Sequence, residues 1–118
     1  MLSLTNVSDA LGYKTVVNVT NTLGGGLNLN LHCLSADDDL GAQQLLPRGS
    51  AVWRFKVNFF ATTLFHCSFQ WNQVLHKFVI YDASRDDPVC RDYCQWNIYK
   101  NGPCLSKPRG ETDCYTWN

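Results

Sequence analysis

Four segments of the chain alternate large apolar residues with polar ones at every second position. They are LNLNLHC (27–33), WRFKVNF (53–59), FHCSFQW (65–71) and CQWNI (94–98). Successive side chains of a β-strand point to opposite faces, so this period of two places one apolar row against a core and one polar row in water. The alternation therefore restricts these segments to half-buried strands, because a helix would need apolar residues three and four positions apart.

Further strands are predicted around these four. YKTVVNVTN (13–21) places Val17 and Val19 inward and Asn18 outward, and KFVIYD (77–82) is apolar on both faces and is expected at the centre of a sheet. A short strand is also predicted near 114–117. Turn-forming residues separate the strands, at 24–26, 35–41, 47–50 and 101–103. Six or seven short strands of this kind predict an all-β fold, a small disulfide-stabilised antiparallel β-sandwich, with a small barrel as the alternative.

The cysteine count and the chain length complete this prediction. The 118 residues are enough for one domain, 1–118, with one core. An even number of cysteines in a small domain favours disulfides formed in an oxidising compartment. Six cysteines allow 15 pairings, and the sequence does not choose among them, although three of the cysteines fall on inward faces. The six are Cys33, Cys67, Cys90, Cys94, Cys104 and Cys114.

Secretion is also indicated by two glycosylation sequons, at Asn6 and Asn18. No apolar run is long enough for a transmembrane helix, so we expect no membrane insertion. The first residues lack the basic start and long apolar stretch of a signal peptide, so a secreted protein of this sequence would be the mature form. The formal net charge is zero, which argues against nucleic acid as a partner.

The sequence gives little support for a catalytic site or a metal site. His66-Cys67 and His32-Cys33 are strand neighbours that point to opposite faces, so neither pair combines a nucleophile with its base. The cysteines lack the tight CxxC pairs of zinc sites. The aspartates at 37–39 lack the distal glutamate of a calcium loop, and they are expected in a solvated turn or capping a short helical turn at 40–46. We therefore predict no catalytic residue, no metal and no cofactor.

The order of motifs resembles the plant self-incompatibility S-protein family, from about residue 15 to residue 104. The resemblance rests on Asn21 near a strand end, a leucine-rich strand closing on Cys33 and an Asp-Leu-Gly loop. It continues through an F-x-C-x-F-x-W strand and a C-x-W-x-I strand that ends in Gly-Pro-Cys. The matching segments are VNVTNTLGGGLNLNLHCLSADDDLG, WRFKVNFF, TLFHCSFQW, KFVIYD and CRDYCQWNIYKNGPC.

The resemblance implies a small secreted β-sandwich without enzymatic activity. Founding members of this family are stigma proteins that act as ligands for a pollen membrane receptor and trigger rejection of self pollen through calcium signalling. The implied partner is thus a membrane receptor on another cell, and the protein is expected to be a monomer. Cys114 lies beyond the family pattern, which leaves the third disulfide open; Cys90 with Cys114 is the pairing we suggest.

Charged surface groups steer the association of two proteins, and loops can change in sequence without disturbing the scaffold. Receptor contacts are therefore expected on charged loops. The most charged predicted loop is 84–92, and the aspartate turn is second. The candidate receptor-binding residues are Arg85, Asp86, Asp87, Arg91, Asp92, Asp37, Asp38 and Asp39.

Two other functions stay open. One is a secreted defence or toxin-like protein, which the neutral charge and the lack of an amphipathic helix disfavour. The other is an extracellular carbohydrate-binding module, in which Tyr115 and Trp117 would stack on sugars.

Overall fold

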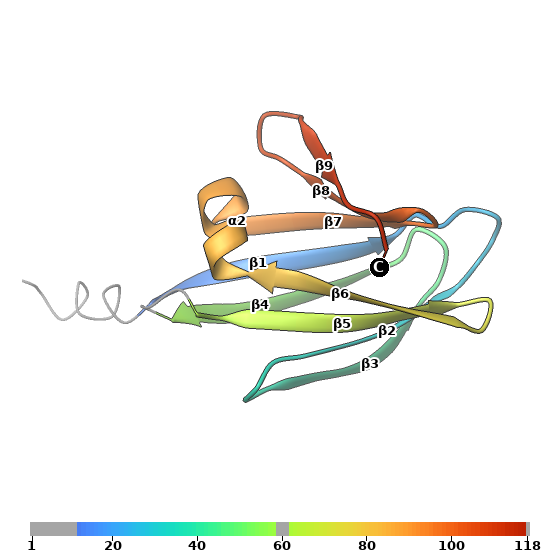
Figure 1. Ribbon diagram of the computed structural model, residues 1–118, viewed down its shortest axis with the longest axis horizontal. Coiled ribbons are helices and arrows are strands. Elements are labelled where there is room, and N and C mark those ends of the chain that lie inside the picture. The colour runs from blue at the N-terminus through green and yellow to red at the C-terminus, as the bar shows by residue number, and fades with distance from the viewer. Residues whose placement is uncertain (1–11, 59–61, 118) are drawn as a thin grey trace, which may run out of the picture.

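Two β-sheets pack face to face in the computed structural model, with one short helix at an end (Figure 1). The structure describes residues 12–58 and 62–117. The elements are β1 (Gly12–Asn21), β2 (Leu29–Leu34), β3 (Asp39–Leu45), β4 (Ser50–Asn58), β5 (Leu64–Trp71), β6 (Val74–Asp82), α2 (Ala83–Cys90), β7 (Tyr93–Tyr99), β8 (Gly102–Ser106) and β9 (Thr112–Cys114).

One sheet has five strands in the order β4-β1-β7-β8-β9, and the other has four in the order β3-β2-β5-β6. The predicted all-β sandwich is confirmed. Its strands are antiparallel except for the β1–β7 pair, which is parallel and aligns Val16 with Tyr93. The described residues contain more strands than the six or seven expected. The helical turn expected at 40–46 is strand β3, and the segment after Cys104 continues β8. The short strand predicted near 114–117 lies earlier, as β9 at 112–114. Backbone pairing with β2 decides the conformation of β3.

The expected central position of KFVIYD is wrong, because β6 lies at the edge of its sheet. The register shifts between Phe65, which is opposite Tyr81, and His66, which is opposite Val79. Ile80 is therefore left unpaired in a bulge, and both Ile80 and Tyr81 are buried. The bulge explains why KFVIYD has apolar residues at consecutive positions, because it turns the neighbours Ile80 and Tyr81 toward the core together.

The core lies between the sheets and contains the inward rows that the alternation predicts. Cys67 is 1% exposed, whereas its neighbour His66 is exposed, so the two side chains do lie on opposite faces. Both layers contribute large buried side chains to the interior, including Val17, Val19, Leu29, Leu31, Phe69, Trp96 and Ile98.

All six cysteines are paired, and each disulfide joins elements that are neighbours in the fold. Cys33 bonds Cys67 directly across β2 and β5. The other bonds are Cys90–Cys94 and Cys104–Cys114. The suggested pairing of Cys90 with Cys114 is therefore wrong, because the hairpin of β8 and β9 places Cys114 opposite Cys104.

The C-terminal segment returns across the sandwich beside β6 (Figure 1). It passes so close to β8 that a Cβ on Gly102 would lie 1.8 Å from the carbonyl oxygen of Tyr115. Gly102 also has a φ of 151°. Only glycine fits this position, which gives a physical reason for the Gly-Pro-Cys motif.

Candidate functional site

Two charged segments lie at the same end of the sandwich, the turn between β2 and β3 and the helix α2 (Figure 1). The backbone N–H of Ala83 donates to the carbonyl of Thr63 over 3.0 Å. A groove of about 870 Å³ at this end is lined by residues 34–38 and 62–66, together with Phe55 and Lys56. The fold therefore brings both predicted contact segments to one end; we call this region, residues 35–39 and 82–92, the charged end.

The most charged segment is mainly a helix, so its prediction as a loop was wrong. Asp82 caps α2 with an extended backbone, and its carboxylate accepts hydrogen bonds from Ser84 N at 3.0 Å and Ser84 Oγ at 2.7 Å. These bonds from Ser84 hold the pKa of Asp82 below its ordinary value. The helix ends at Cys90, whose disulfide to Cys94 ties it to β7. Cap and disulfide fix an eight-residue helix that contains Pro88.

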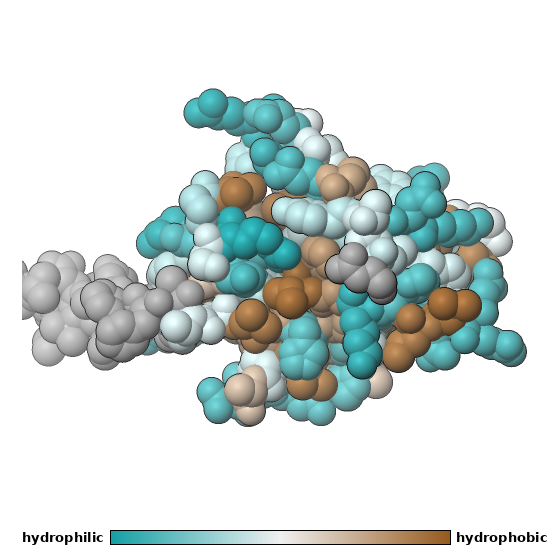
Figure 2. All heavy atoms as spheres, in the orientation of Figure 1, coloured by the Kyte–Doolittle hydropathy of each residue, from teal (hydrophilic) through white to brown (hydrophobic). Residues whose placement is uncertain are grey.

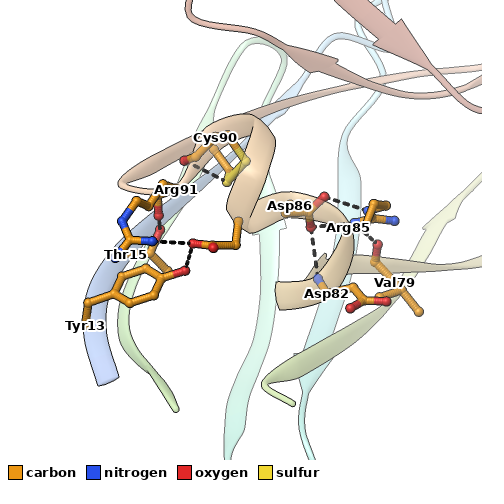
Figure 3. The surroundings of a disulfide bond; sticks show 10 residues. Tyr13, Thr15, Val79, Asp82, Arg85, Asp86, Cys90 and Arg91 are labelled. Carbon is orange, nitrogen blue, oxygen red and sulfur yellow. Dashed lines mark hydrogen bonds and ion pairs between the residues drawn. A yellow bond between two sulfur atoms is a disulfide. The ribbon is translucent and has the colours of Figure 1, made fainter. Parts of the chain in front are cut away.

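Arg85 and Asp86 point into the protein (Figure 3). Asp86 is 1% exposed, and its carboxylate accepts two hydrogen bonds from Arg85, at 2.6 and 2.7 Å, and one from the backbone N–H of Asp82 at 2.9 Å. Arg85 also donates to the carbonyl of Val79 at 2.9 Å. Burial lowers the pKa of Arg85 most, but the hydrogen bonds to Asp86 and the surrounding negative charges together leave that pKa raised.

Aromatic rings surround the same guanidinium. Its central carbon lies 5.3 Å from the ring centroid of Phe78, 5.2 Å from that of Trp96 and 5.6 Å from that of Tyr115. Such cation–π contacts stabilise a desolvated cation. Arg85 and Asp86 therefore fasten α2 to the sandwich, and the buried carboxylate of Asp86 is not presented at the surface.

The other charged residues of the helix segment face outward. The side chain of Arg91 is 57% exposed and that of Asp87 is 31% exposed, and they form an ion pair at 3.0 Å. Tyr13 of β1 donates a hydrogen bond to Asp87, and the guanidinium of Arg91 lies 3.9 Å above the Tyr13 ring (Figure 3). Burial and the bond to Asp87 raise the pKa of Tyr13. Asp92 is exposed and its carbonyl accepts from Val16 N at 3.0 Å.

The aspartate turn presents free carboxylates. Ser35 Oγ accepts from the backbone N–H groups of Asp37, at 3.3 Å, and Asp38, at 3.0 Å, which shapes the turn. Within the described residues, the carboxylates of Asp37 and Asp38 have no protein partner, and both residues are exposed. Asp39 differs, because it accepts from Gly41 N at 2.8 Å and pairs with His32 Nε2 at 2.5 Å, and both contacts lower its pKa.

No metal centre accompanies these carboxylates in the part of the chain that the structure describes, where no group of three or more His, Cys, Asp or Glu side chains is placed to hold an ion. Over residues 12–58 and 62–117, no helix has the length and apolar character needed to cross a membrane. The charged end therefore presents both positive and negative side chains, on a hydrogen-bonded turn and on a helix that is capped and disulfide-bonded.

Sequence reasoning missed Tyr13 and His32 as members of this end. Their contacts with Asp87 and Asp39 follow from sheet pairing, and neither residue stands in a motif. Tyr115 and Trp117, predicted for sugar stacking, are half-buried, and their rings contact other residues of the chain. Tyr115 packs against Phe78 and Trp96, and Trp117 stacks on His76 with ring centroids 4.9 Å apart.

Of the two sequons, Asn6 lies outside the described residues. Asn18 lies on the outer face of β1, where its Nδ2 donates to the hydroxyl of Tyr93 at 3.0 Å.

Comparisons with known proteins agree with this architecture. A family model described as plant self-incompatibility protein S1 matches residues 16–117. S-protein homolog 3 of Arabidopsis thaliana is 44% identical over 111 residues, which cover 87% of this chain and 72% of that protein. S-protein homolog 29 of the same plant is 38% identical over 118 residues, covering 95% of this chain and 87% of that protein.

A solved structure shares the fold, with a TM-score of 0.68 at 19% identity, covering 91% of this chain and 96% of the other. It is a self-incompatibility protein homologue, described as one of a widespread family of small, highly stable, secreted plant proteins.

Proposed function

Because the chain belongs to the plant self-incompatibility S1 family, we propose that it is a secreted, non-catalytic ligand that a membrane receptor on another cell recognises through the charged end. Three disulfides and no free cysteine are consistent with an oxidising compartment. The structural relative described as secreted supports the same localisation. In this role, binding would signal pollen rejection or a related cell–cell response.

The main support for this proposal is that the charged end presents its charged side chains on two rigid elements, a turn between strands and a helix. Asp37 and Asp38 lie on a turn between two strands, and Asp87, Arg91 and Asp92 lie at a helix whose last residue is disulfide-bonded. Little ordering is then needed on binding, which favours affinity. Arg85 and Asp86 contribute indirectly, because they hold this helix in place.

The charge of the exposed groups suggests the chemistry of the receptor. Of the charged residues named above, three exposed ones are aspartates and Asp87 is half-buried against Arg91, so a complementary receptor surface carries lysine or arginine. Such pairing accelerates association at low salt and weakens as ionic strength rises. We therefore expect a salt-dependent association rate.

The test is binding of the labelled, oxidised protein to plant plasma-membrane vesicles. We expect saturable binding that unlabelled protein displaces and that protease treatment of the vesicles removes. The variant Asp37→Asn/Asp38→Asn/Asp92→Asn should bind at least tenfold more weakly. The variant Arg109→Ala/Glu111→Ala, which changes exposed residues beside β9, is the matched control and should bind like the wild type.

Two results would contradict the proposal. Equal binding by both variants would move recognition away from the charged end. Release of dye from protein-free lipid vesicles at low protein concentration would favour the toxin-like alternative.

A further inference from the structure

The two outer faces of the sandwich use their polar side chains differently. On the five-stranded sheet the amide and hydroxyl side chains bind one another, both across strands and along β7. Gln95 Nε2 donates to Thr20 Oγ1 at 2.9 Å and to Asn97 Oδ1 at 3.2 Å, and Asn97 Nδ2 donates to Ser106 Oγ at 3.2 Å. Thr20 also shares a 2.7 Å hydrogen bond with Ser50. The side-chain amides of this face therefore have partners within the sheet.

The four-stranded sheet presents a row of amides that is not satisfied in this way. Asn30 of β2 lies opposite Gln44 of β3 on one side and opposite Gln70 of β5 on the other. In the described part of the chain, none of these three amides has a hydrogen-bond partner, and neither has the neighbouring Ser68 hydroxyl. All four side chains line one shallow groove of about 390 Å³; we call it the amide groove.

The surroundings of the amide groove are neutral and, at one end, apolar. Leu75 lies opposite Gln70 and is 53% exposed. Figure 2 shows apolar atoms gathered over the turn between β5 and β6, where Val74 is also 52% exposed. The charges nearby belong to Lys77, opposite Ser68, and to His32 with its partner Asp39. The amide row itself carries no charge.

We propose that the amide groove binds a neutral oligosaccharide. A side-chain amide both donates and accepts, as a sugar hydroxyl does, so a row of amides can pair with successive hydroxyl groups. Neighbouring strands lie about 4.8 Å apart, so three amides on three strands span roughly 10 Å, the length of about two sugar rings. Leu75 supplies an apolar surface for the C–H face of a ring.

Other occupants fit this face less well. The centre of a protein–protein interface is enriched in aromatic side chains and arginine, and the amide groove has neither. A small apolar ligand needs a deep apolar pocket, whereas this groove is shallow and lined by amides. A charged sugar would lack a partner along the amide row. The amide groove lies on a sheet face and shares only His32 with the charged end, so sugar binding in the groove does not depend on receptor recognition.

The test is NMR titration of the oxidised, 15N-labelled protein with three neutral probes, cellohexaose, xylohexaose and mannohexaose. We expect at least one probe to cause saturable shifts in the side-chain NH2 signals of Asn30, Gln44 and Gln70. The NH2 signals of Gln95 and Asn97, on the opposite outer face, should stay in place. These wild-type signals report the site without any substitution.

A pair of variants then tests the assignment. Asn30→Ala/Gln44→Ala/Gln70→Ala should weaken binding of the effective probe at least tenfold, while Gln95→Ala/Asn97→Ala should leave it unchanged. The proposal would be overturned by the absence of saturable shifts with all three probes at millimolar concentration, or by tighter binding of hexagalacturonic acid. Shifts of the three signals that depend only on protein concentration would also overturn it, because they would assign the face to a second copy of the chain.

Discussion

The side-chain amide of Asn21, at the end of β1 in one sheet, donates a 3.0 Å hydrogen bond to the backbone carbonyl of Leu45, at the end of β3 in the other sheet. The same amide donates to the carbonyls of Leu27, at 2.9 Å, and Leu46, at 3.2 Å. Its oxygen accepts from the backbone N–H of Leu23 at 3.0 Å. Asn21 is 1% exposed, so one buried side chain joins the two sheets and the connections between them.

Replacement of Asn21 by alanine should lower the free energy of unfolding by about 2–4 kcal/mol, because it leaves buried carbonyl and N–H groups without partners. Chemical denaturation of the oxidised protein measures this change. Asn30→Ala is the matched control and should change the free energy by less than about 0.5 kcal/mol, since Asn30 is exposed. Equal effects of the two substitutions would show that Asn21 does not have this role.

The buried pair of Arg85 and Asp86 gives a second prediction. Asp86→Ala should lower the free energy of unfolding by about 3–5 kcal/mol, because it leaves the Arg85 cation in a largely buried site without its partner. The double change Arg85→Met/Asp86→Leu removes both charges and should recover most of that loss. Both values come from denaturant unfolding.

Asp38→Ala is the control for this pair, because Asp38 is an exposed aspartate at the same end. It should be close to neutral for stability. If Arg85→Met/Asp86→Leu is as unstable as Asp86→Ala, the prediction is wrong. The stability lost would then come from the missing ion pair and not from an unpaired buried cation.

The N-cap of α2 predicts a pH dependence. The pKa of Asp82 is lowered in the folded protein, so its contribution to stability is fully present above the ordinary value of 3.8 and is lost as the pH falls through the lowered pKa. Asp82→Ala should therefore lower the free energy of unfolding by about 1 kcal/mol at pH 7. The difference from the wild type should shrink below pH 3.8 and vanish in strong acid.

Denaturation curves from pH 7 to pH 2 test this dependence. Asp37→Ala, which changes an exposed turn aspartate, should follow the wild-type curve over the whole range. A difference between Asp82→Ala and the wild type that grows with falling pH would have the opposite sign to the one predicted.

The three disulfides should differ in their effect on stability. Cross-linking stabilises mainly by restricting the unfolded chain, and the restriction grows with the length of the closed loop. The sequence separations are 34 for Cys33–Cys67, 10 for Cys104–Cys114 and 4 for Cys90–Cys94. Replacing each pair by alanine should therefore lower the free energy of unfolding by about 4, 3 and 2 kcal/mol respectively.

Thermal and chemical unfolding of the three double-alanine variants give this ranking, and peptide mapping confirms which pair is absent. The burial of Cys33 and Cys67 adds to the loss expected for the first pair. If removal of Cys90–Cys94 lowered the free energy of unfolding most, the prediction would be wrong. The contribution of this disulfide to holding α2 would then exceed its effect on the entropy of the unfolded chain.

The sequence predicts the fold well wherever one side of a strand is buried. Burial of one face imposes the period of two, so β2, β4, β5 and β7 have the predicted inward residues, apart from Phe59, which lies outside the described residues. The edge strand β4 follows this rule, but β3, at the edge of the other sheet, does not, because both of its faces are largely exposed. In β3 only Leu45 is buried, so its sequence shows no alternation. The short helix α2 was not predicted for another reason. Its N-cap, its disulfide and the buried Arg85–Asp86 pair hold it in place, so its sequence needs no apolar stripe.

The candidate site was only partly predictable for a similar reason. The charged segments could be found by composition, but the sequence does not show which charge has an internal partner. Arg85 and Asp87 lie two positions apart in one charged run, yet the first is held among aromatic rings and the second lies at the surface, paired with Arg91. The disulfide pairing likewise depends on strand register, which places Cys104 opposite Cys114.

The last prediction concerns the sequon at Asn18. Its side chain lies on the outer face of β1, and Thr20 Oγ1 is 3.2 Å from Asn18 Oδ1. Strands β4 and β7 pair with β1 on both sides, so this segment is accessible to a glycosylating enzyme only before folding. Protein secreted from a eukaryotic host should carry a glycan at Asn18, and Asn18→Gln should remove the corresponding mass in intact-protein mass spectrometry. Asn6→Gln is the control that accounts for the other sequon. Because this glycan would cover the five-stranded sheet, it should leave binding at the charged end unchanged; weaker receptor binding by the glycosylated protein would place the contact surface on that sheet.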